Sequence, residues 1–485
     1  MQKIQNYING ELIAPVNGNY LDNFEPATGK VYSLLPESDQ DDLERAVIAA
    51  EAAQNEWANM SSEARSILLM KLADAIEESS EELAKAEAID NGKPIAFARA
   101  VDSYRSAANI RFFANATTQF SSECHDMGEV GVNYTLRQPI GIVGCISPWN
   151  LPLYLFTWKI APALASGNCV IAKPSEITPM TAYLFSKLCI EVGIPKGVIN
   201  ILHGTGLSIG SPLVEHKKIK AISFTGGSAT GRAIAGKIAP MLKKFSLELG
   251  GKNPTLVFSD SCSSEDDFKK TLSEVARAAF SNQGQICLCG SRIYIERSIY
   301  EKFKKALVEK VKKLKIGDPL EEETQHGALV SEAHRDKVYS YIQLAKKEGG
   351  TILCGGEKVQ LDGRCKDGYF IEPTIIEGLD SQCRTNQEEI FGPVCTLQSF
   401  DSEEEVLALA NGTEYGLAAS IWSKDISRCH KLASKLDFGI VWINSWLLRD
   451  LRTPFGGMKS SGMGREGGLE AMRFFTEPKN VCVKY

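Results

Sequence analysis

Short apolar runs alternate with helical segments along two stretches of this chain, and this alternation constrains the fold more than any other feature. From about residue 138 to residue 260 the β-rich runs are IGIVGCIS, NCVIAK, GVINIL, IKAISF and PTLVF. After residue 290 the same rhythm restarts with SRIYIER, TILCGG, VCTLQSF, LAASIWS and GIVWINS. Alternation of this kind is typical of βαβ units with a parallel sheet, so we predict two α/β halves.

The two ends of the chain follow different patterns. The first 120 residues include DDLERAVIAAEAAQNEW and SSEARSILLMKLADAIEESSEELAKAEA, which repeat apolar residues at helical spacing. We expect this part to be mostly helical, with Ser61 or Ser62 capping the second segment. The last residues, NVCVKY, alternate like a β-strand, and such a strand at a sheet edge can pair with another subunit.

Size and charge exclude several classes of protein. The chain has 485 residues, well above the ~250–300 at which one hydrophobic core stops growing, so two or three domains are expected. Its net charge of −6 argues against a nucleic-acid partner, which would need a basic face. No apolar run approaches the ~18 residues of a membrane span, and MQKIQNYINGEL does not look like a secretion signal. We expect a cytoplasmic enzyme with neither nucleic-acid nor membrane partners.

Two of the 13 cysteines, Cys287 and Cys289, lie close together in the stretch SNQGQICLCG. A metal site is disfavoured, because no second Cys/His pair stands at finger spacing. A disulfide between them is sterically poor. The segment runs from a helix through a glycine-containing turn into a strand, where backbone N–H groups can stabilise a thiolate. Cys287 is therefore either a nucleophile or a packing residue. Cys289 is expected to be a packing residue.

Two other polar residues follow predicted strands. Glu248, in SLELGGKNP, ends an apolar strand, and a desolvated carboxylate there can act as a general base. The alternative is a surface glutamate. Asn150, in ISPWNLPLYLF, stands between a strand and a helix, where it can donate a hydrogen bond to an oxyanion or simply cap the helix.

Three segments suggest a bound dinucleotide. Lys173 and Glu176, in VIAKPSE, stand at the carboxyl end of a strand, a common place for a ribose diol. Gly226 and Gly227, in ISFTGGSATGRAIA, form a turn that can approach a pyrophosphate. The stretch GTGLSIG, with Gly206, departs from the spacing GxGxxG and is weak alone. Two glycine turns at successive strand ends of one sheet are a better signal than either singly.

Seven motifs stand in a definite order along the chain: SPWN, KPSE, FTGG, LELGGKNP, NQGQICLC, EEIFGP and PFGGMKSSGMGRE. Their order and spacing resemble those of the NAD(P)-dependent aldehyde dehydrogenase superfamily, over essentially the whole chain. The resemblance implies an α/β fold with a Rossmann-type cofactor domain at 1–121 and 140–251. An α/β catalytic domain would cover 252–467, and a small β oligomerisation domain would combine 122–139 with 468–485. A homodimer or homotetramer is expected.

The resemblance gives the polar residues their roles. Cys287 looks like the nucleophile that attacks the aldehyde to form a thiohemiacetal, and Asn150 with the backbone N–H of Cys287 resembles the oxyanion hole. Hydride transfer to the nicotinamide leaves a thioester, and Glu248 resembles the base that activates water to hydrolyse it. This agrees with the chemistry of a thiolate, which is nucleophilic and forms a labile acyl ester. Lys159 and Glu466 resemble the family's proton-relay pair.

The cofactor implied by the resemblance is NAD. The positions that look like its contacts are Lys173, Glu176, Gly206, Gly226, Gly227, Glu389, Phe391, Ser147 and Trp149. Gly227 stands where many members carry serine, so one hydroxyl contact to phosphate is missing. A carboxylate such as Glu176 accepts a hydrogen bond from the ribose 2′-OH and repels a 2′-phosphate, which favours NAD over NADP.

Three longer stretches, ISPWNLPLYLFTWKIAPA, QICLC and SWLLRDLRTPFGGMKSSG, are similar to the branch that oxidises 2-aminomuconic semialdehyde in the kynurenine pathway of tryptophan degradation. Such a substrate carries a carboxylate, which an arginine can bind in bidentate fashion. We expect Arg449 and Arg105 to bind it, with Arg111 and Arg452 as the nearest competitors. Candidate apolar walls of the substrate site are Leu151, Trp158, Leu288, Trp446 and Phe455.

Other functions stay open on the sequence. A broad-specificity or retinal aldehyde dehydrogenase would keep the thiol chemistry without needing two arginines. A CoA-acylating enzyme would lack the glutamate base, so Glu248 counts against it. A non-catalytic binding or structural protein on the same fold has no chemical need for Cys287, Glu248 and Asn150 together.

Overall fold

The alternating runs between residues 138 and 260 form a parallel sheet in the computed structural model, which describes residues 1–485. Its five central strands are β8 (Ile142–Ile146), β9 (Cys169–Lys173), β10 (Ile199–Ile201), β11 (Ile219–Thr225) and β12 (Lys244–Glu248). Their order across the sheet is β12-β11-β8-β9-β10, and all neighbours are parallel. The order reverses between β8 and β11, which opens a crevice at the carboxyl ends of these strands.

The first 36 residues are strands rather than helices. β2 (Asn6–Ile8) and β3 (Glu11–Ile13) extend one edge of the parallel sheet, and β24 (Gly462–Met463) extends the other. β1 (Gln2–Lys3), β4 (Tyr20–Glu25) and β5 (Lys30–Pro36) form a separate small sheet. The expectation of a mostly helical start is wrong here, because these strands are too short to show a local period and depend on pairing with distant segments.

Helices cover the eight-stranded sheet. They are α1 (Gln40–Asn59), α2 (Ser62–Glu78), α3 (Ser80–Asn91), α4 (Ile95–Phe97), α5 (Tyr104–Thr117), α6 (Pro152–Ala165), α7 (Met180–Glu191), α8 (Ser211–Glu215) and α9 (Ser228–Ile238). The cap of α2 is Ser61, whose side chain accepts a hydrogen bond from the backbone N–H of Ala64 at 3.2 Å. Every residue of α6 is buried, and this helix is part of the largest apolar core.

The second half is built around a seven-stranded sheet of order β15-β18-β19-β14-β13-β21-β22, in which only the β15–β18 pair is antiparallel. The strands are β13 (Pro254–Val257), β14 (Arg292–Glu296), β15 (Thr351–Cys354), β18 (Thr374–Glu377), β19 (Val394–Phe400), β21 (Ala418–Trp422) and β22 (Ile440–Ile443). Its helices are α10 (Glu265–Phe280), α11 (Tyr300–Val311), α12 (Glu332–Lys347), α13 (Arg384–Gln387), α14 (Glu403–Asn411) and α15 (Ile426–Ala433). Two short ladders pair β16 (Lys358–Val359) with β17 (Phe370–Ile371) and β20 (Tyr415–Gly416) with β23 (Met458–Lys459). The predicted α/β fold with two parallel sheets is confirmed.

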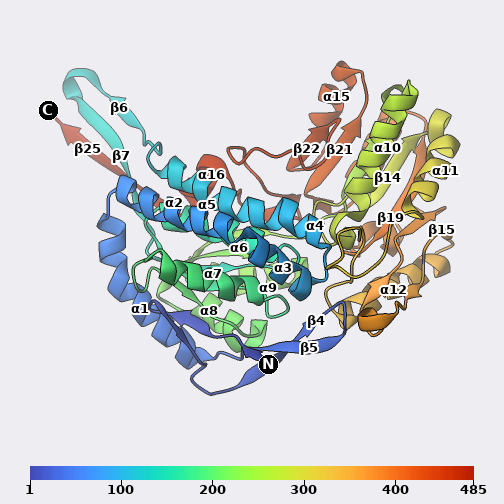
Figure 1. Ribbon diagram of the computed structural model, residues 1–485. Helices are drawn as coiled ribbons and strands as arrows, with labels where there is room; N and C mark the ends of the chain where they lie inside the picture. The colour runs from blue at the N-terminus through green and yellow to red at the C-terminus, as the bar shows by residue number, and fades with distance from the viewer.

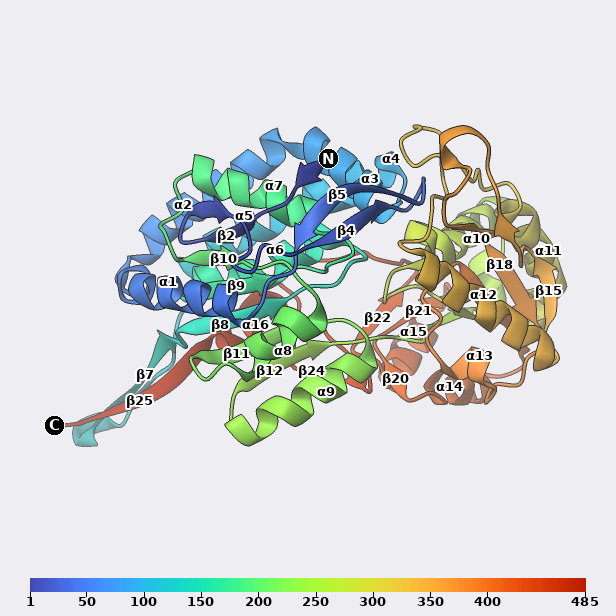
Figure 2. The same ribbon diagram turned by 90° about the horizontal axis from the view of Figure 1, so that it is seen from below.

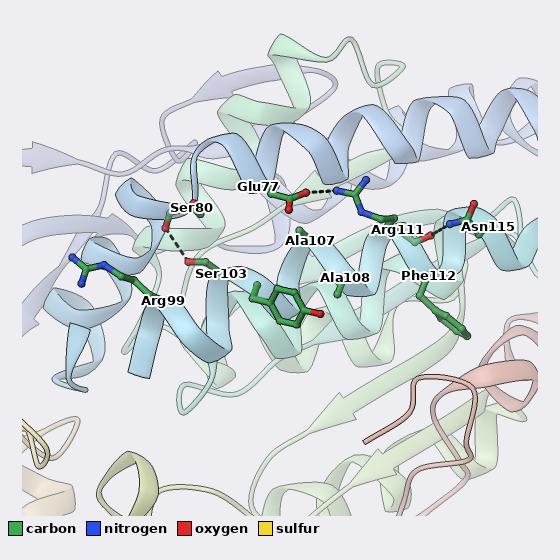
Figure 3. A pocket seen from close by; sticks show the side chains of 10 residues that line it. Glu77, Ser80, Arg99, Ser103, Ala107, Ala108, Arg111, Phe112 and Asn115 are labelled. Carbon is green, nitrogen blue, oxygen red and sulfur yellow. Dashed lines mark hydrogen bonds and ion pairs between the residues drawn. The ribbon is translucent and has the colours of Figure 1, made fainter. Parts of the chain in front are cut away.

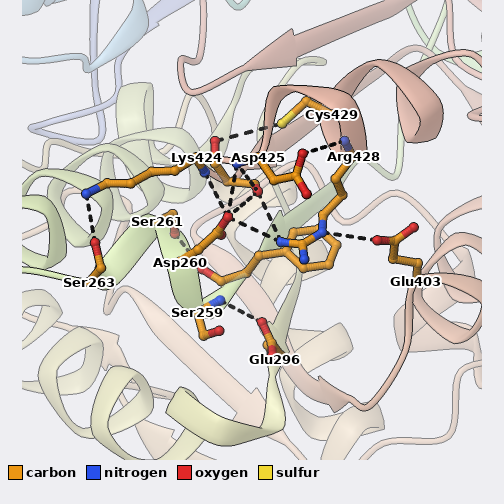
Figure 4. Close-up of polar contacts among 12 residues, drawn as sticks. Ser259, Asp260, Ser261, Ser263, Glu296, Glu403, Lys424, Asp425, Arg428 and Cys429 are labelled. Carbon is orange, nitrogen blue, oxygen red and sulfur yellow. Dashed lines mark hydrogen bonds and ion pairs between the residues drawn. The ribbon is translucent and has the colours of Figure 1, made fainter.

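A polar cluster fastens the outer helix α15 to the end of β13 (Figure 4). Oδ2 of Asp260 accepts hydrogen bonds from the backbone N–H groups of Lys424 and Asp425 at 3.1 and 3.0 Å, and from Ser423 Oγ at 2.8 Å. Arg428 Nη1 adds a contact of 3.3 Å to the same oxygen. All donors come from the turn before α15 or from its first residues, so the cluster serves the packing of this half.

Three antiparallel strands form an arm that projects from the first half, with the C-terminus at its tip (Figures 1 and 2). They are β6 (Cys124–Asp126), β7 (Gly131–Pro139) and β25 (Thr476–Lys484), with β7 in the middle. The predicted terminal strand is therefore present, and β25 pairs with β7 along its whole length. The preceding α16 (Gly468–Phe474) packs on α6 instead of joining the arm. The domain boundaries given above stay a prediction.

Two further findings concern the molecule as a whole. No helix combines the length and the apolar character that crossing a membrane demands. All 13 cysteines are free thiols.

Candidate active site

The loop that carries Cys287 has an unusual backbone. It connects α10 to β14, and Asn282, Gln283 and Gly284 follow one another in the left-handed region, with φ of 50°, 54° and 68°. Such backbone is uncommon for residues other than glycine and has to be held by the surroundings. Here Asn282 Nδ2 donates to the carbonyl of Asn150 at 3.0 Å, and Gln283 Nε2 donates to the carbonyl of Ala328 at 2.9 Å.

The two neighbouring cysteines differ in their surroundings. Asn253 holds the loop beneath both, because its Nδ2 donates to the carbonyls of Cys287 and Cys289 at 2.7 and 2.9 Å. The Cys287 side chain faces two cavities, whereas Cys289 is buried in the apolar core. Burial raises the pKa of both thiols, that of Cys289 to about 12, and the Glu389 and Glu248 carboxylates raise the pKa of Cys287 further. The backbone N–H of Cys287 has no acceptor within the chain.

Glu248 is a buried carboxyl group without a hydrogen-bond partner. It ends β12, and neither of its oxygens accepts a bond from the protein. Burial, and then the nearby Glu466 carboxylate, hold the pKa of Glu248 well above its usual range, although the Lys159 ammonium partly offsets this. Lys159 Nζ lies 2.7 Å from Glu466 Oε1, and both contact Ser223 Oγ at 3.1 Å. The structure thus brings Glu248, Glu466 and Lys159 together.

Asn150 does not cap a helix. The residue before the first turn of α6 is Leu151, so the capping alternative is wrong. Asn150 Nδ2 donates to the carbonyl of Gln285 at 2.9 Å, and a side-chain amide has a second hydrogen to offer. Asn150 and Cys287 line the same cavity.

Two cavities meet at Cys287. The first, which we call the arginine cavity, has a volume of about 230 Å³ and is lined by mostly apolar residues together with Arg105, Arg277, Arg449, Glu248 and Glu466. The second, the Trp149 cavity, has about 220 Å³ and is lined among others by Trp149, Asn150, Glu389, Phe391, His334 and Lys337. Cys287 and Thr225 line both, so the thiol stands where the contents of the two cavities can react.

Arg449 is one of the arginines that line the arginine cavity, and it lacks an acidic partner. Its Nη1 donates to the hydroxyl of Tyr154 at 2.5 Å, and its guanidinium lies 4.1 Å from the ring centre of Phe455 and 4.3 Å from that of Trp158. Its Nη2 is buried without any acceptor. A buried donor of this kind is costly unless a ligand satisfies it.

Arg105 also lines the arginine cavity, and its side chain forms no salt bridge in the chain. The two competitors lie elsewhere. Arg111 points from α5 toward α2, where it binds Glu77 (Figure 3) and also Asp74 at 2.7 Å. Arg452 is exposed and binds Asp450 at 2.6 Å. The structure therefore separates the predicted substrate arginines from the predicted competitors.

The predicted apolar walls are mostly in place. Leu151, Leu288, Trp446 and Phe455 line the arginine cavity. Trp158 is the exception: it is 2% exposed and lies behind the Arg449 guanidinium instead of facing the cavity. It supports the arginine by stacking and is not a wall.

Two residues of the EEIFGP motif, Glu389 and Phe391, line the Trp149 cavity. Glu389 Oε1 accepts a hydrogen bond from the backbone N–H of Gly251 at 2.8 Å. Phe391 has a left-handed backbone, with φ of 61°, and its carbonyl lies 2.7 Å from His334 Nε2. The ring of Trp149 lies 5.2 Å from that of Phe391 and 5.0 Å from that of His334. Burial lowers the pKa of His334 to about 4, so its neutral form donates to Phe391.

A groove of about 640 Å³ adjoins the Trp149 cavity at the crevice between β8 and β11. We call it the glycine groove; it contains the predicted positions Ser147, Trp149, Lys173, Glu176, Gly206, Gly226 and Gly227. Lys173 Nζ donates to Glu176 Oε2 at 3.0 Å. The buried Ser147 Oγ has no partner in the chain, and a Cβ on Gly227 would meet nothing within 4 Å. The groove thus has room and free polar groups for an extended polar ligand.

Several lining residues were not predicted: Tyr154, Arg277, His334 and Lys337. They lie on helices whose apolar spacing looks ordinary, so no local signal distinguishes them. Arg277 donates to the carbonyl of Trp446 at 2.7 Å and pairs with Glu274.

Comparison with known proteins decides the family. The model of the aldehyde dehydrogenase family matches residues 13–481. The chain belongs to the aldehyde dehydrogenase family. It is 49% identical to the 2-aminomuconic semialdehyde dehydrogenase of Mus musculus, over 99% of this chain and 98% of that protein. It is 43% identical to the 2-hydroxymuconic semialdehyde dehydrogenase of Pseudomonas sp. (strain CF600), over the full length of both.

A solved structure gives the same result for the fold. The aldehyde dehydrogenase from Bacillus cereus in complex with NAD⁺ matches with a TM-score of 0.96 and 40% identity, over 100% of this chain and 97% of that chain. The predicted family is thus confirmed. No group of three or more His, Cys, Asp or Glu side chains in this aldehyde dehydrogenase is arranged to hold a metal ion.

Replacing Gly284 tests the left-handed turn of the loop that carries Cys287. A Cβ at this position would collide with the carbonyl of Gly392, and φ is positive. Gly284→Ala should therefore lower the free energy of unfolding by about 2 kcal/mol or more, measured by denaturant melting. Gly236→Ala is the matched control, since α9 leaves open space there, and it should leave stability unchanged or raise it. An equal effect of both changes would contradict the argument.

Proposed function

We propose that this aldehyde dehydrogenase oxidises a semialdehyde that carries a carboxylate, namely 2-aminomuconic semialdehyde, with NAD as the hydride acceptor. The observation that carries the proposal is Arg449, which lines the cavity that ends at Cys287, has no acidic partner and keeps its buried Nη2 without an acceptor. A short carboxylate fills the place of the missing partner. The names of the mouse and Pseudomonas relatives, which refer to muconic semialdehydes, agree with this chemistry.

Cys287 acts as the nucleophile. Its thiolate adds to the aldehyde carbon, and the oxygen that becomes negative is stabilised by the free backbone N–H of Cys287 and by the Asn150 amide. Both donors are fixed before the reaction, because Asn282 binds the carbonyl of Asn150. When bound, NAD supplies the acceptor for the hydride that leaves the substrate carbon. Cys287 then carries the acyl group as a thioester.

Glu248 acts as the base in the second half of the reaction. Its oxygens are free of protein donors, so one can accept a proton from water. The water oxygen adds to the thioester carbon, the carboxylate product leaves, and the thiol of Cys287 is restored. Glu466 and Lys159 lie behind Glu248 and provide a route by which the proton can leave.

The glycine groove fits a dinucleotide. The Glu176 carboxylate at the end of β9 suits a ribose 2′-hydroxyl and opposes a 2′-phosphate, which favours NAD over NADP. Gly226 and Gly227 precede α9, whose N-terminus suits the pyrophosphate. The Trp149 cavity, with Glu389 and Phe391, continues from the groove to Cys287 and suits the nicotinamide.

We further propose a homodimer or homotetramer in the cytoplasm. β25 is an exposed edge strand of the arm, so its free backbone groups can pair with a neighbouring subunit. The free thiols fit a reducing compartment. A broad-specificity or retinal enzyme is less well supported, since a neutral aldehyde leaves Arg449 without a partner. A non-catalytic role would leave the arrangement around Cys287 unexplained.

Arg449→Ala tests the substrate. The change should raise KM for 2-hydroxymuconic semialdehyde about 10- to 100-fold, because a charge-assisted hydrogen bond contributes about 1.5–3 kcal/mol. KM for hexanal should change little. Arg452→Ala, which removes an exposed arginine, is the control and should leave both values unchanged. Equal changes of KM for the two aldehydes after Arg449→Ala would refute carboxylate recognition.

Single serine substitutions distinguish the two cysteines. Cys287→Ser should reduce kcat by about 1,000-fold or more, because a serine hydroxyl ionises far less readily than a thiol and forms a less labile acyl ester. Cys289→Ser should keep kcat within about 3-fold, since its thiol only packs. NADH formation measures both, and the reverse result would assign the nucleophile to Cys289.

The pH profile reports Glu248. Because burial raises its pKa, the fraction in the carboxylate form, which is the active base, grows as the pH rises through that elevated value. Steady-state kcat should therefore rise with pH, at values above the usual range of a glutamate, where hydrolysis is rate-limiting. Glu248→Gln should flatten this limb while the first turnover still produces a burst of NADH. A limb that survives in Glu248→Gln would assign it to another group.

A further inference from the structure

A buried cluster of three charged residues lies behind the arginine cavity and has no part in the chemistry above. Lys93 Nζ lies 2.9 Å from Asp102 Oδ2 and 3.5 Å from Glu87 Oε2, and the three side chains are at most 1% exposed. Burial raises the pKa of both carboxyl groups, that of Glu87 to about 8, and the Lys93 ammonium lowers it in part. Burying such charges is expensive, so the cluster needs a reason other than stability.

Glu87 connects the cluster to the first turn of α6. Its Oε1 accepts hydrogen bonds from the backbone N–H of Leu153 at 2.8 Å and from Thr181 Oγ1 at 3.1 Å. The start of α6 has no side-chain cap of its own, so Glu87 satisfies one of the free amide groups that every helix begins with. The next residue is Tyr154, whose hydroxyl holds Arg449. Glu87 therefore supports the position of Tyr154, which orients Arg449.

Asp102 connects the cluster to Arg105, the second proposed substrate arginine. It lies in a π-helical turn, Ala98–Ser103, directly before α5, and such turns are rare and frequent at functional sites. Val101 in this turn and Arg105 just after it line the arginine cavity. The position of the π turn, and with it that of Arg105, depends on where Asp102 is held.

We propose that Lys93 is a positioning residue that sets the spacing between Arg449 and Arg105, and so the selectivity for a carboxylate-bearing aldehyde. The Lys93 ammonium group lies between two carboxyl groups: that of Glu87, which supports the start of α6, and that of Asp102, in the π-helical turn. The proposal rests on the proposed function, since it assumes that the two arginines bind the substrate. Small displacements at a site of this kind have large effects, about 100-fold for 1 Å.

The experiment compares two aldehydes in the full-length enzyme. For Lys93→Met, the ratio of kcat/KM for 2-hydroxymuconic semialdehyde to kcat/KM for hexanal should fall about tenfold or more. The fall should come from KM for the carboxylate-bearing aldehyde, while KM and kcat for hexanal stay within about 2-fold. Lys243→Met is the matched control: Lys243 is also buried and binds only the carbonyls of Val214 and His216, so this variant should lose stability without changing the ratio.

Substitutions of Asp102 keep the test decisive if Lys93→Met does not fold. Asp102→Ser removes the contact with Lys93 while the Lys93–Glu87 pair remains, and the ratio should again fall. Asp102→Asn retains an oxygen acceptor for Lys93, so this variant should keep most of the ratio that the unmodified enzyme shows. An unchanged ratio in Lys93→Met and Asp102→Ser, or an equal loss for both aldehydes, would overturn the role of Lys93.

The outcome for Lys93 can be told apart from that for the proposed function. If Arg449→Ala loses the preference for the carboxylate-bearing aldehyde and the Lys93 and Asp102 variants keep it, the proposed function stands and the positioning role fails. If the unmodified enzyme shows no such preference, the proposed function itself fails.

Discussion

The hydrogen bonds that hold three left-handed residues before Cys287 are the constraint on which the rest of the site depends. A left-handed conformation costs about 1–2 kcal/mol for a residue with a side chain, so Asn282 and Gln283 would not adopt it alone. Their amide groups bind carbonyls of the segment after β8 and of Ala328, which offsets the cost. Because one acceptor is Asn150 itself, the same bonds fix Cys287, the proposed nucleophile, relative to Asn150, its proposed oxyanion donor.

The electrostatics around this loop follow a common rule. A buried charged group normally has a partner, as Lys159 has in Glu466. Glu248 and Arg449, which line the same cavity as Cys287, depart from the rule: Glu248 has oxygens with no donor, and Arg449 has a nitrogen with no acceptor. Unsatisfied groups of this kind concentrate at functional sites, where the substrate completes them. The proposed base, Glu248, and the proposed substrate anchor, Arg449, thus share the feature that the chain leaves polar atoms of both unpaired.

Much of the candidate site could be predicted because its residues end strands. Glu248 closes β12, Lys173 closes β9, and the glycine turn at 226–227 follows β11, so a parallel sheet necessarily gathers them at one edge. His334 and Lys337 could not be found in this way, since they lie on α12 and reach the cavity only through the packing of the two halves. The prediction of helices for the first 36 residues was wrong for a related reason: their strands exist only through pairing with distant partners.

The sequence by itself determined two α/β halves with parallel sheets, because these depend on local periodicity along the chain. Only the tertiary structure decided which arginines are available to a substrate. Arg111 and Arg449 look alike in the sequence, but Arg111 is neutralised by acidic residues of α2, whereas Arg449 meets only aromatic rings and a hydroxyl. Whether a cation is paired depends on side chains that lie far away along the chain and close in space.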